Sequence, residues 1–181
     1  MPERIDASKQ RSPYARLMPG VVLIVALSGC VTAGPTAPPE RLVSAETLAA
    51  NAYCGTHEPQ PDARRIVSRD AWLEHYDAVL QPHIPLDQQA DFKQGEVLWI
   101  AAGRRPTAGY QLLLDQVSVE PEGLVIQIKE QRPRQGAMVA QVITSPCLLL
   151  QIRGARQLPI EIRGALPGLP LVLAPQPSTD Q

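Results

Sequence analysis

Apolar residues recur at helical spacing in one segment of this chain. The segment begins at Ser68, whose side chain can cap a helix, and Asp70 is favourably placed in the first turn. Pro82 ends the pattern. The apolar positions, which are one, three or four residues apart, are Trp72, Leu73, Tyr76, Val79 and Leu80. The spacing predicts one helix that lays an apolar face on a core.

Strand-like segments lie on both sides of this helix. They are rich in β-branched and aliphatic residues, and clusters of Gly and Pro bound them. The predicted strands are 64–68, 96–102, 110–119, 124–130, 137–143, 147–153 and 158–163. Because most of them follow one another with short links, we expect antiparallel pairing in an up-and-down meander. The predicted fold class is mainly β (α+β): an antiparallel β-sheet or sandwich-like domain with one packed α-helix.

The N-terminal segment predicts export and lipid attachment. A net positive stretch precedes the apolar run 21–27, which spans roughly 10 Å as a helix, far short of a hydrocarbon layer of ~30 Å. The run ends in LSGC, Leu27 to Cys30, which resembles the bacterial lipoprotein signal. We expect a lipoprotein signal peptide over residues 1–29, cleavage before Cys30 and acylation of Cys30. The alternative is an ordinary signal peptide followed by a chance cysteine.

The segments after the signal peptide differ in composition. Residues 30–45, which begin with the lipidated Cys30, are rich in Pro, Ala and Thr and predict a linker. The β domain is expected over 46–163, and the Pro-rich residues 164–181 predict a C-terminal tail. The formal net charge of −1 gives no basic bias toward nucleic acid. Val31 stands where an aspartate often retains lipoproteins in the inner membrane, which favours the outer membrane of a bacterial cell envelope.

The two remaining cysteines, Cys54 and Cys147, predict a disulfide. An exported chain meets an oxidising compartment, where paired cysteines are commonly bridged. Two buried thiols are the alternative.

The chain offers little for metal or covalent chemistry. Cys54 and His57 form the one close pair of metal-ligand type, and a zinc site needs three or four ligands. His75 is expected on the solvent face of the helix, with His83 just past it. There is no G-x-S-x-G motif for a nucleophilic serine, and the carboxylates are scattered. We therefore expect no metal, no cofactor and no enzymatic activity.

Several motifs resemble one known family. GRRPTAGYQLLLDQV, residues 103–117, resembles the GxxPTGGYxVxIxxV segment of the C-terminal domain of PrcB, a subunit of a bacterial surface protease complex. IVSRDAWLEHY, with Trp72, is similar to that family's strand-then-helix opening, and Asp91-Phe92 to an Asp-Phe pair before the next strand. ITSPCLLLQI, residues 143–152, is similar to its T-S-P-aromatic segment, with Cys147 in place of the aromatic.

The resemblance covers roughly residues 64–154, and it implies a mainly β domain without catalysis. It also implies secreted or lipid-anchored proteins, at least one of which accompanies a protease. Ala108 replaces a glycine of the family's turn. The shared Pro106, Thr107, Gly109 and Tyr110 also resemble the P-T-T-G-Y loop of chagasin-type inhibitors of cysteine proteases.

Arginines concentrate in the links between the predicted strands. In a meander, alternate links lie at the same end of the sheet, so RRPTAG, QRPRQG and RGARQ would meet there. This predicts a rim that consists of Arg104, Arg105, Arg132, Arg134, Arg153 and Arg156. Arginine is suited to bidentate contact with carboxylate or phosphate, so the rim, together with Pro106, Thr107, Gly109 and Tyr110, is the candidate partner-contact surface. Solvated loop arginines without a partner are the alternative.

These observations predict a membrane-anchored lipoprotein whose β domain binds a protein partner, an envelope or secreted protease among the candidates. A chagasin-like protease inhibitor and a structural envelope lipoprotein with no specific partner are the alternatives.

Overall fold

The described part of the protein forms two β-sheets and one helix. The structure is a computed structural model, and it describes residues 42–56, 58–80, 83–84 and 90–177. The predicted signal peptide 1–29, the lipidation site Cys30 and most of the predicted linker lie outside the described residues. Within the described ranges, no helix is long and apolar enough to cross a membrane.

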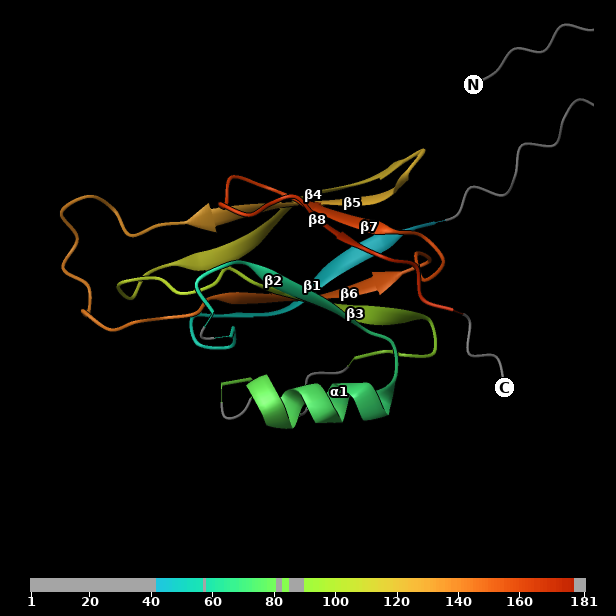
Figure 1. Cartoon of the computed structure of the whole chain (residues 1–181), viewed down its shortest axis with the longest axis horizontal. Helices are drawn as coiled ribbons and strands as arrows, with labels where there is room; N and C mark the ends of the chain where they lie inside the picture. Colours follow the sequence, from blue (N-terminus) through green and yellow to red (C-terminus); the bar gives the residue numbers. More distant parts are fainter. Residues whose placement is uncertain (1–41, 57, 81–82, 85–89, 178–181) are drawn as a thin grey trace, which may run out of the picture. The chain divides into compact units, whose positions relative to one another are not determined.

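The elements follow one another as in Figure 1. The strands of the described chain are β1 (Ser44–Asn51), β2 (Asp62–Ile66), β3 (Gly95–Ala101), β4 (Gln111–Glu120), β5 (Gly123–Gln131), β6 (Cys147–Arg153), β7 (Ile160–Arg163) and β8 (Leu171–Leu173). Between β2 and β3, helix α1 (Arg69–His75) continues into the π-helical turn η1 (Tyr76–Leu80).

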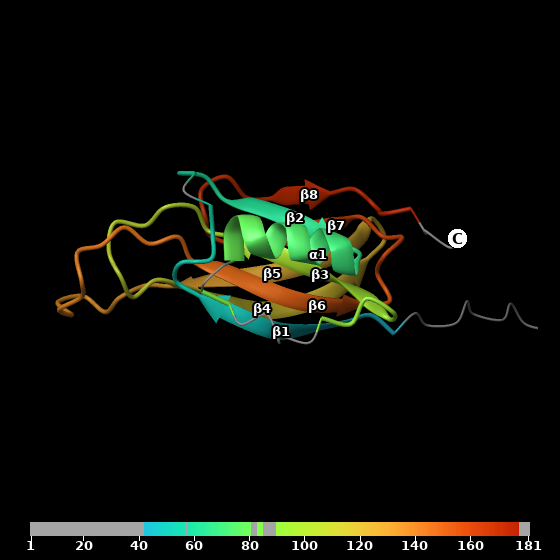
Figure 2. The ribbon, with the colours of Figure 1, turned by 90° about the horizontal axis from the view of Figure 1, so that it is seen from below.

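The strands form a sandwich of two four-stranded sheets. One sheet has the order β1-β6-β3-β2, and the other has the order β4-β5-β7-β8. At the two edges of the sandwich, β1 contacts β4 and β2 contacts β8. Helix α1 covers the outer face of the first sheet, so the domain has three layers (Figures 1 and 2). The predicted fold class, a mainly β sandwich-like domain with one packed helix, is confirmed.

Strand β3 is buried on both faces and therefore belongs to two cores. Leu98 and Ile100 point into the cluster between the two sheets. Val97 and Trp99 alternate with them and point toward the helix, where they pack with Trp72. This period-two alternation explains why the whole of β3 is apolar apart from Gly95 and Glu96.

Helix α1 has the predicted N-cap, but its buried face includes His75, which was predicted to face solvent. The Ser68 side chain accepts a hydrogen bond from the Ala71 N–H, as predicted. His75 is not on the solvent face: it is 3% exposed, and its ring lies edge-on to Trp99 with 4.7 Å between ring centroids. Burial, and then the nearby Arg64, lower the pKa of His75 from 6.5 to about 4. A neutral histidine on this face acts as an aromatic core residue.

One predicted strand is absent, and two strands were missed. Residues 137–143 form no strand, and β1 and β8 were not predicted as strands. Neither of the neighbours of 137–143 in sequence, β5 and β6, is an edge strand with a free side. Strand β5 already lies between β4 and β7, and β6 lies between β1 and β3. The unpredicted β1 therefore occupies the position beside β6 that 137–143 would need.

The connectivity also departs from a meander. Strands β5 and β7 are parallel, with Leu124 opposite Ile160, because β6 crosses to the other sheet between them. The predicted tail contributes β8 to this second sheet, so the domain extends beyond residue 163.

Candidate functional site

Two loops meet at one end of the sandwich. Strand β3 ends opposite the start of β6, with Ala101 paired to Cys147, and β4 begins opposite the end of β5, with Gln111 paired to Gln131. The links 103–110 and 132–146 therefore extend from the same end, which we call the loop end. Figure 1 shows them on the left, and Figure 2 shows them side by side.

Backbone hydrogen bonds join the two loops. Arg105 and Thr144 exchange both of their backbone N–H···O bonds, at 2.8 and 3.0 Å. The Ala108 N–H donates to the Ala140 carbonyl at 3.0 Å, and the Thr144 hydroxyl donates to the Thr107 carbonyl at 3.0 Å. The two loops therefore form one structural unit.

Gly109 fits this unit because it lacks a side chain. Its φ of +90° lies in the region that favours glycine, as the turn chemistry predicted. A Cβ at this position would also lie 3.1 Å from the Pro133 side chain of the other loop. The conformation of one loop and its contact with the other thus depend on the same glycine.

The arginines of the loop end differ in their partners. Arg105 and Arg132 both bind the buried Glu130 carboxylate through their Nε atoms, on the two different oxygens. Both side chains are held by this carboxylate, which offsets one of their two positive charges. In the described part of the chain, the side chains of Arg104 and Arg134 make no hydrogen bond or ion pair, and both residues are exposed. These two guanidinium groups are the ones available to a partner.

Arg153 and Arg156 do not join this group, so the predicted six-arginine rim is wrong. Arg153 is paired with Gly95 at the opposite end of β6, and its guanidinium bonds Glu46. The Arg156 guanidinium donates to the carbonyls of Phe92 and Gly95. The meander assumed a strand at 137–143, and its absence moves the β6–β7 link to the other end of the sandwich.

Exposed apolar side chains accompany the free arginines. Residues 137–143 contain three aliphatic side chains in water: Met138 is 102% exposed, Val142 43% and Ile143 64%. An open groove with a volume of about 510 Å³ borders Ile143. It is lined by Tyr53, Gly55, Thr56, Glu58, Ala78, Val79, His83, Ile143, Thr144 and Ser145. A groove of mixed polar and apolar lining thus extends from the loop end toward the helix.

A disulfide fixes the base of the loop end. Cys54 and Cys147 are bonded, with 5.3 Å between their Cα atoms and a sequence separation of 93, as the cysteine count predicted. Both residues are fully buried. The Gly55 N–H donates to the Ser145 carbonyl, and the Ser145 N–H donates to the Ala52 carbonyl. The segment after β1 is therefore tied to the start of β6.

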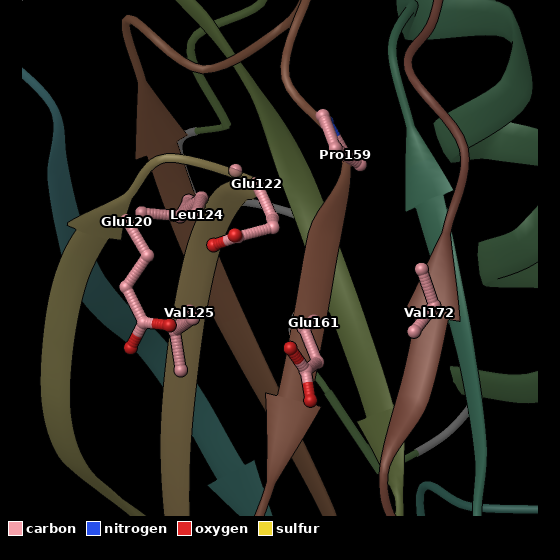
Figure 3. A pocket seen from close by; sticks show the side chains of 8 residues that line it. Glu120, Glu122, Leu124, Val125, Pro159, Glu161 and Val172 are labelled. Atoms are coloured by element: carbon pink, nitrogen blue, oxygen red, sulfur yellow. The ribbon is translucent and has the colours of Figure 1, made fainter.

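A second hollow lies at the opposite end, which we call the turn end after its Glu120–Gly123 turn. The hollow has a volume of about 190 Å³ and an apolar floor. Glu120 and Glu122 lie on either side of the turn, and Glu161 comes from β7 (Figure 3). Arg163 bonds both Glu120 and Glu161, and its hydrogen bond lowers the pKa of Glu161. Figure 3 shows Val172 of β8 on the far side of the hollow.

The remaining predicted contact residues belong to the loop end. Pro106 is exposed, and Thr107 and Tyr110 are half-buried. Their conformation is held by the 132–146 loop, a contact that sequence reasoning missed. The exposed residues of 137–143 were also missed, because strong β propensity there predicted a buried strand. Among the described residues, no group of three or more His, Cys, Asp or Glu side chains could hold a metal ion.

The sandwich and its paired loops define a β domain with a structured, exposed loop surface and one covering helix. Residues 97–153 match the family model described as PrcB C-terminal, which confirms the resemblance for that stretch. The match runs from β3 through β6 and includes both loops of the loop end. No curated protein and no solved structure matches the chain.

Proposed function

We propose that this protein is a lipid-anchored, non-catalytic component of the bacterial cell envelope that docks on a protease through its loop end. The observation that carries the proposal is the joined pair of loops, which presents two unpaired arginines beside exposed aliphatic side chains. Interface cores combine apolar contact with arginine in this way. The PrcB C-terminal match supports association with a protease-related complex, because the matched residues include both loops.

The point at which the chain enters the domain supports the loop end as the docking surface. Ser44 at the start of β1 is paired with Arg153, so the described chain enters the domain at the turn end. Leu42 lies against Gly154 at that same end. Seven residues of β3 separate the two ends, a distance of about 20 Å. A lipid on Cys30 would therefore be tethered to the turn end, which leaves the loop end clear of the tether.

Reversing both free charges should weaken partner capture. In the variant Arg104→Glu/Arg134→Glu, we expect roughly tenfold lower recovery of the partner after pull-down from detergent-solubilised envelopes, because two favourable contacts become repulsive. The substituted side chains make no hydrogen bond or ion pair among the described residues, so the fold should be unchanged. Circular dichroism melting of both proteins checks this.

The matched control is Arg64→Glu/Arg69→Glu, which changes the net charge equally at exposed positions outside the two loops. Its capture should stay within twofold of the wild type. Equal loss in both variants would show that only the overall charge matters. Unchanged capture by Arg104→Glu/Arg134→Glu would remove these arginines from the interface.

A further inference from the structure

The segment 137–143 has the composition of a strand and no strand partner. AMVAQVI is rich in β-branched and aliphatic residues, and it runs without a turn or bend. The chain reverses just before it, at Gln135–Gly136, where the Ala137 N–H bonds the Arg134 carbonyl at 2.9 Å. Both strands adjacent to it in sequence already have two neighbours in their sheets. This chain therefore offers 137–143 no strand position beside β5 or β6.

Most backbone groups of the segment are unpaired. The N–H groups of residues 138–143 make no hydrogen bond among the described residues. The Ala140 carbonyl is bonded to the 103–110 loop, which identifies the side of the segment that faces the domain. In an extended chain the backbone groups of alternate residues point to opposite sides. Those of Val139 and Gln141 therefore point outward, where a further strand could bond them.

The charge around the segment favours an acidic partner strand. The stretch 131–146 contains Arg132 and Arg134 and no acidic residue, and the unpaired Arg104 belongs to the adjoining loop. We propose that an extended segment of the partner, carrying Asp or Glu beside apolar residues, adds to 137–143 as a strand. Its backbone would bond the outward groups, and its carboxylates would meet Arg104 and Arg134.

A second copy of this chain is a poorer occupant. Two copies paired through 137–143 would bring two sets of the exposed Arg104 and Arg134 together, and neither side chain has a carboxylate partner among the described residues of its own chain. The proposal rests on the proposed function, since it specifies how the partner binds the loop end. The experiment must therefore distinguish a wrong binding mode from a wrong binding surface.

Photocross-linking from Met138 tests the binding mode. A benzoylphenylalanine at this fully exposed position is introduced into the full-length chain in intact cells, and the cross-linked peptide is sequenced by mass spectrometry. We expect one main partner peptide with Asp or Glu beside apolar residues. Adding Gln141→Pro removes an outward N–H and should lower the cross-link yield roughly tenfold.

Two controls isolate the backbone contribution. Val142→Pro introduces the same ring one residue away, where the N–H faces the domain, and its yield should stay within twofold. The cross-link yield of Gln141→Ala should also stay within twofold, although this variant loses the side-chain hydrogen bond to the Val139 carbonyl.

The other outcomes overturn the proposal. Equal yields from Gln141→Pro and Val142→Pro, or a partner peptide without acidic residues, would contradict strand addition while leaving the loop end as the docking surface. A cross-link to this chain itself would identify a dimer instead. Absence of any cross-link from Met138 and from Ile143 would remove the loop end as the docking surface, and the proposed function would fail with it.

Discussion

Replacing Arg65 by alanine should lower the free energy of unfolding by about 4 kcal/mol. Arg65 on β2 is buried, and it binds both oxygens of the buried Glu96 carboxylate at 2.6 and 2.8 Å. It also donates to backbone carbonyls in the β6–β7 link and beyond β8, those of Ala155, Arg156, Leu158 and Ala174. Alanine would leave a buried carboxylate unpaired and these carbonyls without their donor. Urea denaturation of the purified domain measures the loss.

Arg65→Lys is the informative control. A lysine keeps the charge but cannot bind a carboxylate in two places while reaching the carbonyls. We therefore expect it to recover less than half of the loss. If Arg65→Lys were as stable as the wild type, charge alone would matter at this site. If Arg65→Ala unfolded at the same urea concentration as the wild type, the hydrogen bonds of Arg65 would not stabilise the fold.

Reducing the Cys54–Cys147 disulfide should cost a similar amount, about 4.6 kcal/mol in the chain-entropy model. The cysteines are 93 residues apart, so the bond restricts much of the unfolded chain. The measured loss can be smaller where the reduced, unfolded chain retains structure. Denaturation with and without reductant gives the difference without any substitution.

The double variant Cys54→Ala/Cys147→Ala provides the matching control. It should unfold at the same urea concentration with and without reductant. If the wild type is equally insensitive, or if both cysteines can be alkylated in protein taken from the envelope, the bond does not contribute in the cell.

Local chemistry in the sequence predicted several features of the fold correctly. Ser68 caps the helix because its side chain bonds the first turn, and Gly109 has the positive φ that its turn requires. The two cysteines left after Cys30 form a disulfide. Each inference needed only neighbouring residues or a general rule about exported proteins.

Strands that depend on partners far away in the sequence could not be predicted from the local sequence pattern. In β1, SAETLAAN carries only one large apolar residue, Leu48, because an edge strand buries little. In β8, the short LVL lies among prolines that are typical of a tail. Conversely, 137–143 looks like a strand, but the positions beside β5 and β6 are already filled. Local propensity does not reveal which neighbouring positions are already filled.

The candidate site was predicted only in part, because its residues also depend on which strands pair. Arg104 and Arg134 belong to the loop end, but one wrongly assigned strand placed Arg153 and Arg156 there as well. Sequence alone also gave no sign that Glu130 pairs with both Arg105 and Arg132. Charge counts in loops therefore overstate the number of arginines that are free to bind.

Photocross-linking from both ends of the sandwich tests the central claim most directly. Benzoylphenylalanine is placed in intact cells at the exposed Met138 or Ile143 of the loop end, and at the exposed Val119 or Val172 of the turn end. The account predicts a cross-link to a protease from the loop-end positions and none from the turn-end positions. Cross-links from the turn end, with none from the loop end, would contradict it.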